Sequence, residues 1–110
     1  MKTHQEIDQR SLALHRLVAS KIRANPDLFG RAKITLARWR DLVSNSSHPY
    51  LTEWETLMQQ GMEPCLAMAT EDSPRAAALR QSSPFAGILT HQERFAFLKN
   101  WSRSNEASST

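Results

Sequence analysis

Two residues near the N-terminus have the types and the spacing that could act on a phosphodiester. Arg10 and His15 are separated by four residues in the run RSLALH. An arginine can stabilise the charge of a phosphate, and a histidine can take the proton of an attacking 2′-hydroxyl. A five-residue offset, however, places the two side chains ~140° apart around a helix, which does not favour joint action on one substrate.

The same pair resembles the arginine–spacer–histidine motif of HEPN-type ribonucleases, which are small helical proteins. The resemblance implies RNA cleavage, with Arg10 at the phosphate and His15 assisting the attack. In that family the motif lies late in the chain, whereas here it falls in the first predicted helix. A HEPN-like ribonuclease is therefore the alternative function, and our main interpretation assigns no catalytic residue.

The other reactive side chains form no recognisable catalytic or metal-binding motif. Cys65 is the single cysteine of the 110 residues, so they contain neither a disulfide nor a cysteine-pair zinc site. It lies in the apolar run CLAMA, where a buried and inert thiol is expected. None of the four histidines has another histidine three or four residues away. We therefore expect no metal and no cofactor.

Basic and acidic side chains are segregated along a chain of net charge +3. Eight bases and one acid occur between residues 9 and 40, and six acids without a base occur between residues 41 and 72. We expect these segments to be neighbouring helices whose solvent faces attract each other. The exposed bases Arg31 and Arg38 suggest a second alternative, weak and non-specific binding of nucleic acid, although the acidic segment would repel phosphate.

Capping residues and prolines divide the chain into helices. Thr3 and Glu6 form a capping box for a first helix, which should end at Asn25 because Pro26 follows. The second helix starts at Pro26, and the polar run 44–48 is a loop. A third helix follows Pro49. The first helix is expected to turn one apolar side inward, formed by Ile7, Leu14, Leu17, Val18 and Ile22.

The second half of the chain contains shorter elements. Gly61 suits the end of the third helix, a short apolar helix covers 65–69, and another runs from Ser73 to near Arg80. A second capping box, in the run THQE from 90 to 93, opens a last helix that presents Phe95, Leu98 and Trp101. No strand pattern is found. The sequence predicts an all-α, compact bundle of five to six helices, with a single domain over 1–102 and a disordered polar tail over 103–110.

Length and hydropathy restrict the cellular setting. The chain lacks the run of ~18 apolar residues that a membrane-spanning helix needs. Its first residues, MKTHQEIDQR, lack the apolar core of a secretory signal. We therefore expect a cytoplasmic protein without a membrane partner.

The segment RQSSPFAGIL, residues 80–89, has the most unusual composition. Pro84 and the adjacent turn make it rigid, and its apolar side chains are uncommon in a plain loop. These side chains could fill the core between the last two helices. They could also form an apolar docking surface with two arginines at its rim. On the second interpretation the partner-binding residues are Arg75, Arg80, Phe85 and Ile88.

Four sequence features together resemble a group of small bacterial proteins encoded beside nucleotidyltransferase-type toxins. They are LARW at 36–39, the helix around Trp54, EDS at 71–73 and LRQSSPF at 79–85. The resemblance covers about residues 4–101 and implies a partner subunit of a toxin–antitoxin pair in the bacterial cytoplasm. On this basis the main hypothesis is a non-catalytic protein-binding subunit, antitoxin-like, whose partner is another protein such as a nucleotidyltransferase-type toxin.

Overall fold

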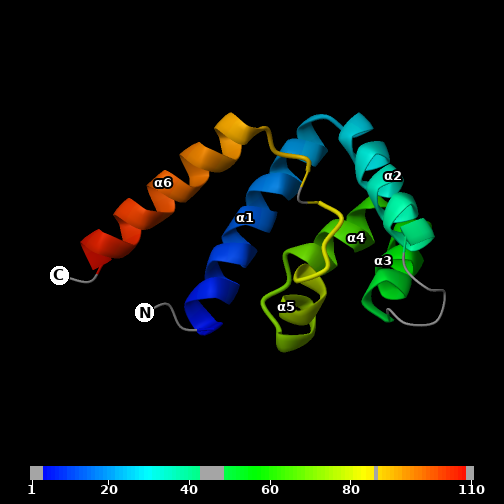
Figure 1. Ribbon diagram of the computed structural model, residues 1–110, viewed down its shortest axis with the longest axis horizontal. Helices are drawn as coiled ribbons and strands as arrows, with labels where there is room; N and C mark the ends of the chain where they lie inside the picture. The colour runs from blue at the N-terminus through cyan, green and yellow to red at the C-terminus, as the bar shows by residue number, and fades with distance from the viewer. Residues whose placement is uncertain (1–3, 43–48, 86, 109–110) are drawn as a thin grey trace.

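Six helices follow one another along the described part of the chain (Figure 1). The computed structural model describes residues 4–42, 49–85 and 87–108, and within these ranges the side chains of 5–103. The helices are α1 (His4–Ala24), α2 (Asp27–Leu42), α3 (Pro49–Gln60), α4 (Met62–Ala69), α5 (Pro74–Arg80) and α6 (His91–Ser108). No strand occurs in this described part. The prediction of an all-α bundle is therefore confirmed.

The helix ends follow the capping signals of the sequence. The Asn25 amide donates to the carbonyls of Lys21 and Ile22, which closes α1 just before Pro26. Gly61 separates α3 from α4 with a φ of 129°, a conformation that side chains rarely adopt. Ser73 accepts a hydrogen bond from the Ala76 amide and caps α5. The expected capping box at Thr3 lies outside the described residues.

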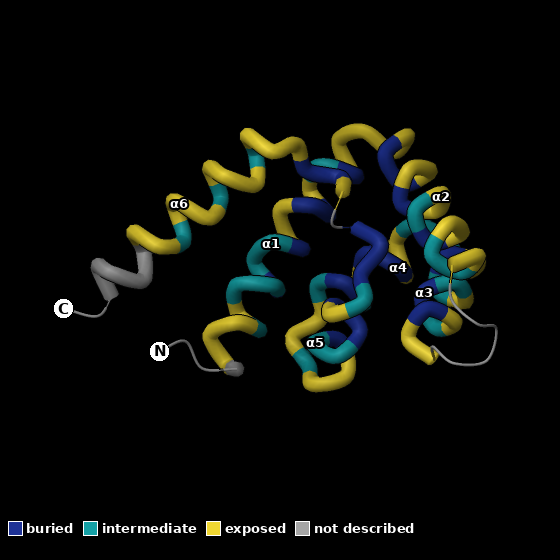
Figure 2. Tube along the Cα trace, viewed as in Figure 1, coloured by how far each residue is buried: buried dark blue, intermediate teal, exposed yellow. Residues whose placement is uncertain are grey.

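Trp54 lies at the centre of the core, fully buried on α3. Its indole N–H donates to the carbonyl of Leu79 at 2.9 Å, which ties α3 to α5. The dark segments of Figure 2 show that buried residues gather where the first five helices meet the segments 81–85 and 87–89. The core side chains around Trp54 include Val18, Ile22, Phe29, Leu36, Leu51, Met58, Cys65, Leu66, Leu79 and Phe85.

Ion pairs join the basic first half of the chain to its acidic middle. Arg23 on α1 contacts Glu63 on α4 at 2.9 Å. Arg40 on α2 contacts Glu55 on α3 at 3.5 Å. This arrangement confirms the expectation that the two charged segments form neighbouring helices. Because these pairs are open to solvent, they contribute little to the free energy of folding.

Helix α6 leaves the rest of the molecule. It begins beside the C-terminal end of α1 and extends away from the other helices (Figure 1). The radius of gyration is 14.6 Å, against about 13 Å for a compact domain of this length. α6 also continues to Ser108, beyond the expected end of the domain at residue 102, because no glycine or proline interrupts it.

Candidate protein-docking surface

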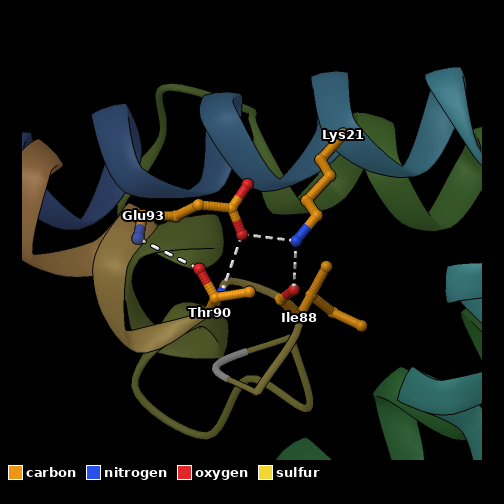
Figure 3. Close-up of polar contacts among 4 residues, drawn as sticks. All are labelled: Lys21, Ile88, Thr90 and Glu93. Atoms are coloured by element: carbon orange, nitrogen blue, oxygen red, sulfur yellow. Dashed lines mark hydrogen bonds and ion pairs between the residues drawn. The ribbon is translucent and has the colours of Figure 1, made fainter.

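A small polar cluster joins the start of α6 to α1 (Figure 3). Lys21 forms an ion pair with Glu93 and donates to the Ile88 carbonyl at 2.9 Å. The Thr90 amide donates to the same Glu93 oxygen at 2.8 Å, and the Glu93 amide donates to the Thr90 hydroxyl at 3.1 Å. The capping box predicted at Thr90 is therefore confirmed.

Glu93 remains ionised at the centre of this cluster. The hydrogen bond from Lys21, aided by the Thr90 amide, lowers the pKa of Glu93 to about 2. The cluster fixes the first turn of α6 against α1, and from this junction the two helices diverge (Figure 1).

The side of α1 that faces α6 carries apolar residues that are not buried. Lys21 marks this side through its contact with Glu93. Ile7, Leu14 and Leu17 lie within about 40° of Lys21 around the helix. Ile7 is 42% exposed and Leu17 40% exposed, while Leu14 is half-buried. Of the stripe predicted to turn inward, Val18 and Ile22 join the core, whereas Ile7 and Leu17 do not. The predicted burial of Ile7 and Leu17 is therefore wrong.

The apolar side chains of α6 are also largely uncovered. Phe95 is 69% exposed and Leu98 37% exposed. Phe97 and Trp101 are half-buried and stack on each other with ring centroids 6.2 Å apart. In Figure 2 most of the described length of α6 is exposed, with half-buried positions recurring along it. Phe97, Leu98 and Trp101 fall within about 100° of one another around α6, whereas Phe95 lies about 160° from Phe97.

Between α1, α5 and α6 lies a hollow of about 520 Å³. Its apolar lining comes from Ile7 and Leu14 on α1 and from Phe97 and Leu98 on α6. A second hollow of about 450 Å³ lies along α6 at Phe95 and shares Arg94 and Leu98 with the first. We define the α1–α6 surface as the set Ile7, Arg10, Leu14, Leu17, Arg94, Phe95, Phe97 and Leu98.

The polar part of the α1–α6 surface is mainly cationic. Arg10 and Arg94 line the larger hollow from opposite walls. Within the described part of the chain neither guanidinium takes part in an ion pair. Asp8 also lines this hollow and lies near enough to Arg80 to favour its charged form. The surface therefore combines exposed apolar side chains with two available arginines.

The residues predicted to anchor a partner lie elsewhere. Phe85 is fully buried against Trp54, with ring centroids 5.5 Å apart at 83°. Ile88 is buried as well. The prediction that these two side chains form an exposed docking surface is therefore wrong, and the alternative that they fill the core is confirmed. The turn around Pro84 directs both side chains inward, and the Phe85 ring packs against Trp54.

The two arginines proposed for the rim also serve internal contacts. Arg80 is buried and donates to the carbonyls of Glu71 and Ala69, at 2.8 and 3.3 Å, where α4 ends. Burial lowers its pKa, and its Nε has no hydrogen-bond acceptor among the described residues. Arg75 is exposed and forms an ion pair with Glu53 on α3. Arg80 is thus unavailable to a partner on the surface.

His15 and Arg10 do not form a common site. The His15 ring is buried, with Nδ1 2.7 Å from the Ser11 carbonyl and Nε2 2.8 Å from the Ser83 hydroxyl. Since a carbonyl only accepts, Nδ1 carries the proton and Nε2 accepts from Ser83. Burial lowers the pKa of His15 and favours this neutral ring. Arg10 lines the α1–α6 hollow instead.

The remaining candidates lie apart from this surface. Arg31 and Arg38 are exposed on α2, as the sequence predicts. Cys65 is buried in the core, where desolvation raises its pKa to about 12 and suppresses the thiolate. No three metal-binding side chains of the His, Cys, Asp or Glu type gather anywhere in the described ranges.

Sequence reasoning finds the apolar residues of α1 and α6 but does not identify them as an uncovered surface. A docking face can be told from a core face only when the chain has more apolar side chains than its core has room for. That surplus becomes visible only when Trp54, Phe85 and their neighbours already fill the centre. The unpaired state of Arg10 and Arg94 depends equally on which acids lie near them in space.

Comparison with known proteins assigns no function to this chain, so the proposed function rests on the α1–α6 surface. No helix in the described ranges is both long and apolar enough to span a membrane. Searches of protein-family models, of curated proteins and of solved structures find no match to this chain.

Proposed function

We propose that this chain is a non-catalytic subunit that binds another protein through the α1–α6 surface. The observation that carries the proposal is the exposure of two apolar residues of α6, Phe95 and Leu98. An 18-residue helix gains little stability in water unless its apolar side packs against something. Clustered apolar side chains rimmed by polar residues are typical of protein-binding surfaces.

The resemblance to proteins encoded beside nucleotidyltransferase-type toxins supplies the biological role in this proposal. The chain would be the antitoxin-like member of a bacterial pair, and it would neutralise its partner by covering an active site or holding an inactive complex. Its reactive groups agree with a non-catalytic role, because His15 is buried and neutral and Cys65 is protonated. The buried ring also lowers the support for the ribonuclease alternative.

The test is co-purification with the product of a neighbouring nucleotidyltransferase-type gene. The two proteins are co-expressed with a tag on the toxin, and the complex is measured by pull-down and size-exclusion chromatography. We expect the wild-type chain to be retained and Leu98→Asp to be lost. Failure of the wild-type chain to bind this product would contradict the proposed partner.

The matched control is Ile34→Asp. Ile34 is a 61% exposed apolar residue on α2, outside the α1–α6 surface. Replacement by aspartate changes an exposed apolar residue in the same way as Leu98→Asp. If both variants keep the wild-type melting temperature and both retain the partner, the α1–α6 surface is not the interface.

A further inference from the structure

We infer that the partner segment held by the α1–α6 surface is an amphipathic helix with acidic residues beside its apolar stripe. This inference rests on the proposed function and specifies the chemistry of the binding partner. It follows from three properties of the α1–α6 surface: its walls are helices without a strand among the described residues, it is about three helical turns long, and its net charge is positive.

The backbone environment favours a helical segment. The walls of the hollow are helices, and the described residues offer no strand to which an extended peptide could add. An extended segment over the apolar lining would leave its amides and carbonyls without partners. A helix satisfies its own backbone and presents only side chains to Ile7, Leu14 and Leu98.

The length of the surface sets how much of the partner helix is covered. Ile7 and Leu17 are ten residues apart on α1, which corresponds to about 15 Å, or roughly three turns. A partner helix lying along this line would use apolar residues at intervals of three and four. Leu98 and Phe97 of α6 would contact the same stripe from the other wall.

The positive charge of the α1–α6 surface favours a partner helix with acidic residues on both sides of its apolar stripe. Arg10 and Arg94 lie on opposite walls of the hollow, so each borders one side of a helix placed between α1 and α6. A guanidinium can bind a carboxylate through two parallel hydrogen bonds. Asp8 is the one acid among the described residues that line this hollow, so the two arginines leave it with a net positive charge. A helix with basic flanks would bring like charges together at the rim.

A second copy of the chain fits this charge pattern poorly. Two α1–α6 surfaces facing each other would oppose Arg10 and Arg94 with the same residues. Three acids of the middle segment are already engaged within the chain, since Glu53, Glu55 and Glu63 pair with arginines. A separate acidic partner avoids both difficulties.

The experiment uses the full chain and two fluorescent 18-residue helical peptides. Both peptides carry the same leucine stripe, and the flanking positions are glutamate in one and lysine in the other. Binding is measured by fluorescence anisotropy at about 150 mM salt. We expect the glutamate peptide to bind at least about tenfold more tightly, with an affinity that falls as salt rises.

Charge reversal provides the specific variant. The double variant Arg10→Glu and Arg94→Glu should lose about tenfold in affinity for the glutamate peptide and gain affinity for the lysine peptide. The matched control is Arg31→Glu with Arg38→Glu, which reverses two exposed charges on α2 and should leave the preference unchanged. Circular dichroism checks that both variants keep the wild-type helix content.

The remaining outcomes each contradict a defined part of the inference. Equal binding of the two peptides, or binding of neither, would overturn the acidic helix while leaving the toxin pull-down as a separate test of the proposed function. A dimer of the free chain that Leu98→Asp dissociates in sedimentation would identify a second copy as the occupant. If the glutamate peptide binds as expected and the toxin is not retained, the inferred chemistry stands and the proposed partner does not.

Discussion

At the residue scale, His15 connects the turn segment 81–89 to α1. The Phe85 amide donates to the Ser83 hydroxyl at 3.1 Å. Ser83 donates to His15, and His15 donates to the Ser11 carbonyl. Because each buried polar atom of this chain of hydrogen bonds has a partner, the segment can bring Phe85 into the core without leaving unsatisfied groups.

Protonation of His15 should destabilise the fold. Burial lowers the pKa of His15 from its usual 6.5, so the unfolded chain binds a proton more readily than the folded one. Stability is therefore complete above about pH 6.5 and decreases as the pH falls below this value. Urea unfolding at pH 7.5 and pH 5 should show a lower midpoint at pH 5, and His15→Gln should reduce the difference. An equal difference in the variant would assign the effect to another group.

Phe85 should behave as a core residue rather than a binding residue. Phe85→Ala removes a fully buried ring beside Trp54 and should lower the free energy of unfolding by about 3–5 kcal/mol. Arg75→Ala, at the exposed end of an ion pair, should change it by less than about 1 kcal/mol. Denaturant unfolding of both variants measures the contrast. If the Phe85→Ala protein has wild-type stability, the assignment of Phe85 to the core is wrong.

At the element scale, α2 contains a glycine that its helix does not need. Gly30 is exposed within α2, and a methyl group at this position would meet no atom within 4 Å. Gly30→Ala should therefore raise the free energy of unfolding by roughly 0.5–1 kcal/mol. Gly61→Ala is the contrasting variant, because the φ of 129° at Gly61 is strained for alanine. The melting temperature should rise for Gly30→Ala and fall for Gly61→Ala. Shifts of the same sign would contradict the backbone conformation described for one of the two glycines.

Helix α6 should be the least protected helix of the free protein. From 94 to 103 the residues of α6 are exposed or half-buried, whereas the C-terminal half of α1 contributes Val18, Ala19 and Ile22 to the core. Amide hydrogen exchange should be faster after residue 95 than over 18–24. Addition of a partner that covers the α1–α6 surface should slow the exchange of α6. Equal protection of the two segments in the free chain would contradict the uncovered state of α6.

Several boundaries of the helices could be predicted from local chemistry, but the packing face of α1 could not. Pro26, Gly61 and Ser73 act on their own backbone neighbours, so their effect can be read from the sequence. The buried side of α1 depends on distant residues. Helical periodicity identifies an apolar side around Ile7 and Leu17, yet the core is completed by Leu12, His15 and Ala19 from the adjacent side.

At the scale of the whole molecule, the charge pattern could be predicted in outline. The segregation of bases and acids along the chain indicates attraction between neighbouring helices, and the pairs at Arg23 and Arg40 agree with it. The sequence does not show which bases remain without an acid. Arg10 and Arg94 are 84 positions apart, and their shared hollow depends on the direction in which α6 leaves its junction.

That direction is set by very few atoms. One oxygen of Glu93 accepts from both the Thr90 amide and the Lys21 ammonium. The same atom therefore caps the N-terminus of α6 and holds α6 against α1. The 18 residues of α6 extend about 27 Å from this vertex. A rotation of about 10° there would move the far end by about 5 Å, roughly half the width of a helix. The geometry of this one junction therefore determines how wide the space between α1 and α6 is along the whole α1–α6 surface.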